Sequence, residues 1–136
     1  MMTAKKIPPA SPSSSTNAFA TVAGLAGWAV PGLGHLLLKR WVRGLVYFSS
    51  VCALAFTGLA LRGNIFSPSA ADPFDFLGFL ANLGTGSLYF LARSLDGVPD
   101  VSRAAGDYGT RFFATAGVLN LLFAIEAYEI GCGRKR

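Results

Sequence analysis

The residues best suited to chemistry in this sequence are three carboxylates that border its long apolar stretches. Glu126 and Glu129 lie three residues apart near the end of the last stretch, so on a helix they share one side. Asp75 lies at the start of the preceding stretch. If both stretches cross a membrane in opposite directions, the three acids reach one face, close to Arg62. Such a cluster could bind a cation or relay a proton, because carboxylates inside a membrane are costly and usually functional.

A structural role for the same acids is the favoured interpretation. Glu126 and Glu129 lie within about a turn of the predicted helix end, where a long side chain reaches water easily. Arg62 is expected to neutralise Glu126. We therefore predict an interfacial ion pair, with ion coupling as the alternative.

His35 is the only histidine, and a neutral imidazole suits both catalysis and metal binding. No cysteine or acid stands near it in the sequence to complete a site. We expect it to hydrogen-bond the backbone around Pro31. Cys52 and Cys132 lack paired-ligand spacing. No nucleophile elbow, phosphate-binding glycine loop or zinc signature occurs. The sequence therefore predicts neither an enzyme nor a cofactor or metal site.

The composition favours a membrane protein. The chain has 136 residues, of which 52% are hydrophobic and 14% charged, and its mean hydropathy is +0.47. An average soluble domain has about 25% charged residues, so this chain has too few to cover its surface in water. The net charge of +5 comes from short basic clusters beside apolar runs, which is typical of topology signals. We exclude nucleic acid as a partner, because no basic stripe with interleaved aromatic residues is present.

Four apolar segments predict an all-α membrane bundle of two helical hairpins. The segments are residues 18–38, 44–61, 74–92 and 112–130. Each is close to the roughly 20 residues that a membrane-spanning helix needs. They form one transmembrane domain, 18–131. A Pro- and Ser-rich tail over 1–17 is expected to be disordered, and 132–136 is a basic tail.

Several residues mark the expected helix ends. Asp72 is a predicted cap with Pro73 at the first helical position, Thr110 is a predicted cap, and Gly131 is a stop signal. Pro31 removes a backbone donor and should kink the first helix. That segment therefore either spans with a kink or turns back.

Small and polar residues repeat every four positions, which places them on one helix face. Gly78, Asn82 and Gly86 form such a face in the third segment, and Asn120 in the fourth is the expected partner of Asn82. Further faces of this kind are Ser49, Ala53 and Thr57 in the second segment, and Ala20 with Gly24 and Ala23 with Gly27 in the first. Small residues let helices approach closely, so we expect these faces to pack helices together or to mediate self-association.

The most specific motif joins the first two segments through a glycine-rich kink and a basic turn. Its residues are Pro31, Gly32, Gly34, His35, Lys39, Arg40, Arg43 and Gly44. Residues 20–61 resemble the two-transmembrane-helix domain family, whose hairpins carry a Gly-x-His/Gln element before a tight charged turn. That family has an aromatic pair and a glycine where this chain has Leu36-Leu37 and Lys39. The resemblance implies a helical hairpin and no known chemistry.

Residues 115–130 resemble the end of a small bacterial membrane protein family of unknown function, which implies a bacterial inner-membrane location. A structural or protein-interaction role is expected, with the lipid bilayer and a homo-oligomer or membrane protein as partners. The alternative is a small transporter, channel or ion-coupled component.

The basic residues do not by themselves decide the orientation. With four spans they divide six to six between the two faces. If the first segment does not cross, the count becomes eight to four, and if the last does not, nine to three. We expect the loop over residues 39–43 to be cytoplasmic.

Overall fold

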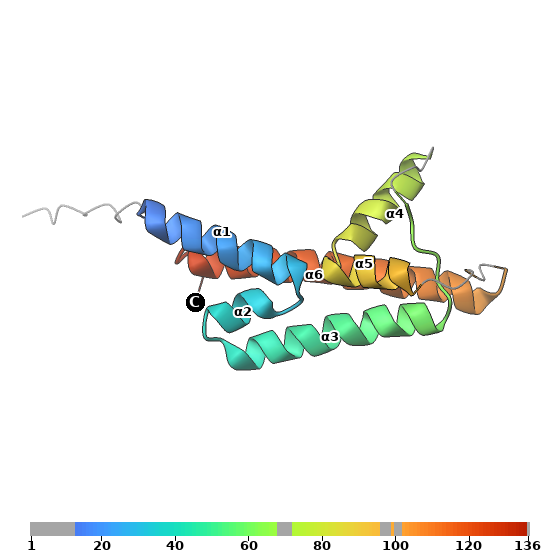
Figure 1. Cartoon of the computed structure of the whole chain (residues 1–136), viewed down its shortest axis with the longest axis horizontal. Helices are drawn as coiled ribbons and strands as arrows, with labels where there is room; N and C mark the ends of the chain where they lie inside the picture. The colour runs from blue at the N-terminus through green and yellow to red at the C-terminus, as the bar shows by residue number, and fades with distance from the viewer. Residues whose placement is uncertain (1–12, 68–71, 96–98, 100–101, 136) are drawn as a thin grey trace, which may run out of the picture.

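The structure, a computed structural model, describes residues 13–67, 72–95, 99 and 102–135. These residues form six helices and no strand, which confirms the all-helical prediction. The helices are α1 Ser14–Ala29, α2 Leu33–Leu37, α3 Trp41–Ala60, α4 Pro73–Leu83, α5 Ser87–Ser94 and α6 Ala104–Gly131 (Figure 1).

The longest helix, α6, is the axis on which the others pack (Figure 1). It runs antiparallel to α1, since Gly131 at its end lies against Ala20 near the start of α1. It also runs antiparallel to α3, since Phe113 near its start lies against Gly58 near the end of α3. The close approach depends on glycine: a Cβ on Gly58 would lie 2.7 Å from the Gly109 carbonyl oxygen.

The first predicted span is two helices rather than one kinked helix. Helix α1 ends at Ala29, and the chain reverses through Pro31 and Gly32, whose φ of +78° suits only glycine well. Helix α2 then runs back beside α1 (Figure 1), with Gly34 against Gly27. Of the two outcomes that Pro31 allowed, the chain turns back. The reason is that the donor-less proline and the left-handed glycine together end the helix instead of bending it.

The third predicted span is also broken. Helix α4 ends at Leu83, and α5 begins after Gly86, which has a φ of +62°. Asp72 caps α4 by accepting from the Phe74 N–H at 3.0 Å, and Pro73 occupies its first turn, as predicted. The left-handed backbone of Gly86 interrupts the helix, and this residue lies so close to the Trp28 carbonyl oxygen that no side chain would fit there.

Two helices in the described part of the chain, α3 and α6, are long and apolar enough to cross a membrane. The prediction of four spans is therefore not supported. Helix α6 begins at Ala104 rather than at residue 112, and Thr110 is not its cap, because its hydroxyl donates to the Gly106 carbonyl oxygen inside the helix.

Helix α1 begins at Ser14, inside the predicted tail, and Ser13 caps it by accepting from the Thr16 N–H. The remainder of the predicted tail, residues 1–12, lies outside the described residues.

The two halves of the chain repeat one order of elements. Each has a helix, a reversal at a positive-φ glycine, a short returning helix and then a long apolar helix. The reversals are at Gly32 and Gly86, and the long helices α3 and α6 run in opposite directions (Figure 1). The two reversals therefore enter from opposite ends of the molecule and meet beside the middle of α6.

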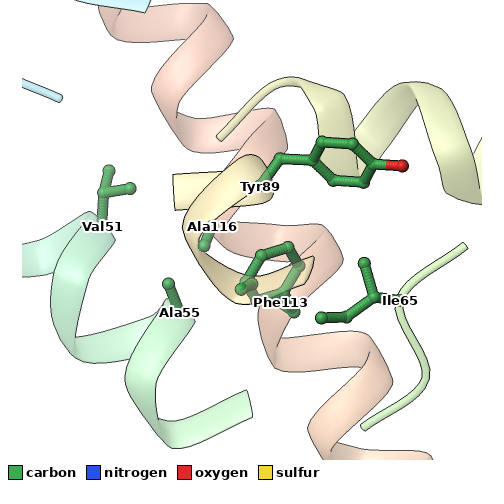
Figure 2. Packing of buried hydrophobic residues seen from close by; sticks show 7 residues of the cluster. Val51, Ala55, Ile65, Tyr89, Phe113 and Ala116 are labelled. Carbon is green, nitrogen blue, oxygen red and sulfur yellow. The ribbon is translucent and has the colours of Figure 1, made fainter. Parts of the chain in front are cut away.

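A hydrophobic core lies where the returning helix α5 covers α3 and α6. Figure 2 shows Val51 and Ala55 of α3 facing Phe113 and Ala116 of α6, with Tyr89 of α5 and Ile65 beside them. The Tyr89 hydroxyl donates to the Phe66 carbonyl oxygen at 3.2 Å, which satisfies its polar end.

Candidate functional site

Glu126 of α6 is the carboxylate with the richest set of partners. Its Oε1 accepts from Arg43 Nη1 at 3.1 Å, and its Oε2 accepts from the Tyr47 hydroxyl at 2.9 Å. Both partners come from the first two turns of α3. The Glu126 side chain is 22% exposed, so water screens these contacts only in part.

His35 of α2 completes this cluster. It is 1% exposed, its Nε2 lies 3.6 Å from Glu126 Oε2, and its ring meets the Tyr47 ring edge-on at 4.7 Å. The 3.6 Å separation is too long for a hydrogen bond. Helix α2 is a separate short helix and is not part of either long helix. Burial lowers the pKa of His35, which the nearby Glu126 carboxylate opposes and the charges of Arg43 and Arg40 reinforce.

Aromatic packing fixes the position of the cluster. The Tyr47 ring stacks on Phe123 of α6 at 3.7 Å with an interplanar angle of 2°. Gly44 lets α2 approach α3, because a Cβ there would lie 2.8 Å from Leu36 Cδ2. The cluster thus ties the returning helix α2 to both long helices. Since Glu126 already accepts from two donors, its local chemistry is that of a structural anchor.

The structure does not bring the predicted acidic cluster together. Arg62 follows the far end of α3, about 28 Å along the axis from Arg43 at roughly 1.5 Å per residue. Arg43, and not Arg62, is therefore the partner of Glu126. Glu129 pairs with Lys135 at 2.9 Å near the end of the chain.

Asp75 lies exposed in the first turn of α4, apart from both glutamates. The prediction that these residues share one face assumed four continuous helices. In the structure the first and third segments are each broken into two helices, so that assumption does not hold.

A second polar group lies where the two helix reversals meet. Asn120, fully buried in α6, donates from Nδ2 to the carbonyl oxygens of Trp28 and Gly84, both at 2.9 Å. The Trp28 indole N–H donates to the Leu83 carbonyl oxygen at 3.1 Å. Broken helices leave carbonyl groups without intrahelical donors, and Asn120 supplies a donor to each of two helix ends.

Asn82 is not the partner of Asn120, contrary to our prediction. It is 0% exposed, and neither its Nδ2 nor its Oδ1 has a hydrogen-bond partner. Gly78 lies against the Phe66 ring, and Gly86 lies against the Trp28 carbonyl. The face predicted for the third segment therefore packs against other parts of the same chain. The broken helix explains the lost pair, since it brings the Gly84 carbonyl rather than the Asn82 amide to Asn120.

The predicted hairpin motif builds the first reversal and the turn after it. Pro31, Gly32 and Gly34 are buried at the reversal, and Lys39 with Arg40 forms the turn between α2 and α3. Arg43 and the buried Gly44 lie in the first turn of α3. Lys39 has a φ of +60°, which is uncommon for a residue with a side chain. The Arg40 N–H donates to the His35 carbonyl oxygen at 2.8 Å and closes the turn.

Tyr47 and Trp28 were not predicted as site residues. For Tyr47 a signal existed, because Arg43 and Tyr47 are four residues apart and share a helix face. No such signal existed for Trp28, since its indole N–H donates to the end of α4, which is far away in the sequence. Among residues 13–67, 72–95, 99 and 102–135, no group of three His, Cys, Asp or Glu side chains could hold a metal ion.

In the part of the chain that the structure describes, these observations define an all-helical protein with two helices of membrane-spanning length, joined by the hydrogen bonds of Glu126. The chain belongs to the family of unknown function DUF6677, whose model matches residues 22–136. This agrees with our prediction of an uncharacterised family, while the resemblance of residues 20–61 to two-transmembrane-helix domains stays a prediction. No curated protein and no solved structure matches the chain.

Proposed function

We propose that this chain is an integral protein of a bacterial cytoplasmic membrane with a structural, non-enzymatic role in protein interaction. Its spans are α3 and α6, which at about 1.5 Å per residue extend roughly 30 and 42 Å, enough for a hydrocarbon core of about 30 Å. Large apolar side chains on the outer surface, such as Val46, Phe56 and Leu122, support contact with lipid.

The division of charge supports one orientation. Because α1 turns back, the start of α1, the turn before α3 and the end of α6 belong to the same side. Eight basic residues fall there: Lys5, Lys6, Lys39, Arg40, Arg43, Arg134, Lys135 and Arg136. Four fall on the other side: Arg62, Arg93, Arg103 and Arg111. The positive-inside rule therefore favours a cytoplasmic location for the first group.

The contacts of the acids favour interaction over ion transport. Transport was our alternative because Asp75, Glu126 and Glu129 were expected to gather, and the structure separates Asp75 from the other two. Glu126 is engaged by Arg43 and Tyr47, so its contacts join helices.

The proposed interaction depends on an exposed face of small residues on α3. Helix α3 buries Gly44, Val51, Ala55 and Gly58 against the rest of the chain. Its opposite side presents Ser49, Ala53 and Thr57, all exposed and spaced by four. The corresponding faces of α1 and α4 lie against α6, α2 and Phe66 and are therefore used internally. We infer that the α3 face binds the same face of a second copy, since such faces are self-complementary about a twofold axis.

Cysteine cross-linking in native membranes tests this pairing. In a Cys52→Ala, Cys132→Ser background, we expect Ser49→Cys and Ala53→Cys to form disulfide-linked dimers on mild oxidation. Phe48→Cys is the matched control, because Phe48 is exposed on α3 but points away from this face. Equal cross-linking at positions 48 and 53, or none at 49 and 53, would contradict the proposal.

A further inference from the structure

The turn between α2 and α3 forms a basic surface pocket that the proposed pairing does not use. The pocket has a volume of about 310 Å³. It is lined by Lys39, Arg40, Trp41, Val42 and Arg43. Its wall is therefore three cations, one indole and one aliphatic side chain within five consecutive residues.

Two of these cations are not engaged by acids of the chain. Arg43 pairs with Glu126, whereas Lys39 and Arg40 take part in no ion pair within the described part of the chain. The backbone holds both in place: the Lys39 N–H donates to the Leu36 carbonyl oxygen at 3.0 Å, and the Arg40 N–H to that of His35. The fold thus fixes a positive charge pair on a tight turn.

The position of the pocket along α3 points to a lipid headgroup. Helix α3 begins at Trp41 and is about 30 Å long, which equals the thickness of the hydrocarbon core. Lys39 and Arg40 then lie just outside that core, at the level of the phosphates. Trp41, which is 69% exposed, lies at the boundary where tryptophan is enriched in membrane proteins.

We propose that this pocket binds the phosphate headgroup of an anionic phospholipid. Lys39 and Arg40 pair with the phosphate, the Trp41 indole lies against the glycerol region, and Val42 contacts the acyl chain. Basic pockets beside membrane helices on the cytoplasmic side bind anionic headgroups through this chemistry. The inference rests on the proposed membrane location but not on pairing through α3, so the two can fail separately.

Native mass spectrometry of the full chain in a neutral detergent tests the site. We expect the protein to retain phosphatidylglycerol in preference to phosphatidylcholine. Each basic residue near a membrane surface contributes about fivefold to binding of anionic lipid, so Lys39→Gln with Arg40→Gln is expected to weaken retention about 30-fold. The matched control is Arg62→Gln with Arg93→Gln, which removes two exposed charges at the other end and should leave retention unchanged.

Three results would overturn the proposal: equal retention of the two lipids by the wild type, an equal loss in both double variants, or full displacement by soluble glycerol phosphate. The last would assign the pocket to a soluble phosphate compound. Should the Lys39, Arg40 variant fail to fold, salt provides the second measurement. Raising the salt concentration must then reduce the preference of the wild type for phosphatidylglycerol, because exposed charges are screened.

Discussion

The Tyr47 hydroxyl donates to Glu126 Oε2 at 2.9 Å and joins α3 to α6 across 79 positions of sequence. Arg43 binds the other oxygen of the same carboxylate at 3.1 Å, and the His35 ring lies edge-on against Tyr47. One acid thus joins α3 to α6 at the basic end of the molecule. The returning helix α2, which has only five residues, lies against this pair through the edge-on contact of the His35 ring with Tyr47.

Replacing Glu126 should weaken this end of the protein. Glu126→Ala removes two hydrogen bonds to a charged acceptor, and such bonds contribute roughly 1.5–3 kcal/mol each when well shielded. Because Arg43 is 43% exposed, we expect a smaller total of about 1–3 kcal/mol. Thermal unfolding in detergent, followed by circular dichroism, measures the loss. The control is Glu129→Ala, which breaks a more exposed pair with Lys135 and should change stability by less than about 1 kcal/mol. Equal losses would contradict the role assigned to Glu126.

Two buried asparagines should respond differently to the same change. Asn120→Leu removes the donor for the carbonyl oxygens of Trp28 and Gly84, and we expect a loss of about 1–3 kcal/mol. Asn82→Leu replaces a buried amide that has no partner with an apolar group of similar size, so stability should be unchanged or increase. Chemical unfolding of both variants measures the difference. If Asn82→Leu proved the more damaging change, the assignment of the helix junction would be wrong.

The reversal at Gly86 should not accept a side chain. Alanine there requires a φ of +62° and places its Cβ against the Trp28 carbonyl oxygen, so we expect Gly86→Ala to cost about 2–5 kcal/mol. Gly133→Ala separates the cost of the positive φ from the cost of the contact with Trp28, because Gly133 has a φ of +74° with open space around it. That variant should lose only about 1–2 kcal/mol. Similar melting temperatures for the two variants would show that the contact with Trp28 contributes nothing.

Labelling of single cysteines distinguishes two spans from four. In a cysteine-free background, an impermeant maleimide added outside spheroplasts should label positions 66 and 102 but not positions 10, 42 and 134. With two spans, positions 10 and 42 share a side, because α1 turns back before α3. Four spans would place them on opposite sides. Labelling of only one of the two would therefore contradict the proposed topology.

The stability of the protein should fall in mild acid because of His35. Burial lowers its pKa in the folded protein, so below the ordinary value of 6.5 the unfolded chain binds a proton that the folded chain does not. Stability is therefore complete above pH 6.5 and decreases as the pH falls below it. The Tm in detergent between pH 7.5 and 5.5 measures this, with His35→Gln as the control. The groups around the imidazole are Glu126, Tyr47, Arg43 and Arg40. An equally steep decline in the variant would show that His35 is not the cause.

The start of α4 was predicted correctly from local signals, because the cap Asp72 and the donor-less Pro73 act on their own backbone. Gly131 is the last residue of α6, but the left-handed glycine that follows the helix end is Gly133, with a φ of +74°. The start of α6 was missed, since its cap residue Arg103 makes no side-chain hydrogen bond to the helix end and leaves no capping signal in the sequence.

The candidate site was predicted only in part. Glu126 was identified from its cost in an apolar helix, but its partner was assigned to Arg62 because sidedness was counted from four crossings. The break at Gly86 carries no proline and lies in an apolar run of helical length, so no local signal predicted a helix end there. Without knowledge of that break, neither the membrane side of each loop nor the neighbours of Glu126 could be assigned from the sequence.

The helical class, the scarcity of charge and the position of the break at Pro31 could be predicted from the sequence, because each follows from the chemistry of neighbouring residues. Three features are visible only in the folded chain: α4 and α5 are separate helices, Arg43 and Tyr47 bind Glu126, and Asn120 joins two helix ends. These relations depend on backbones that approach through glycines far apart in the chain, as Gly86 approaches Trp28. Such contacts exist only once α6 has brought both halves together.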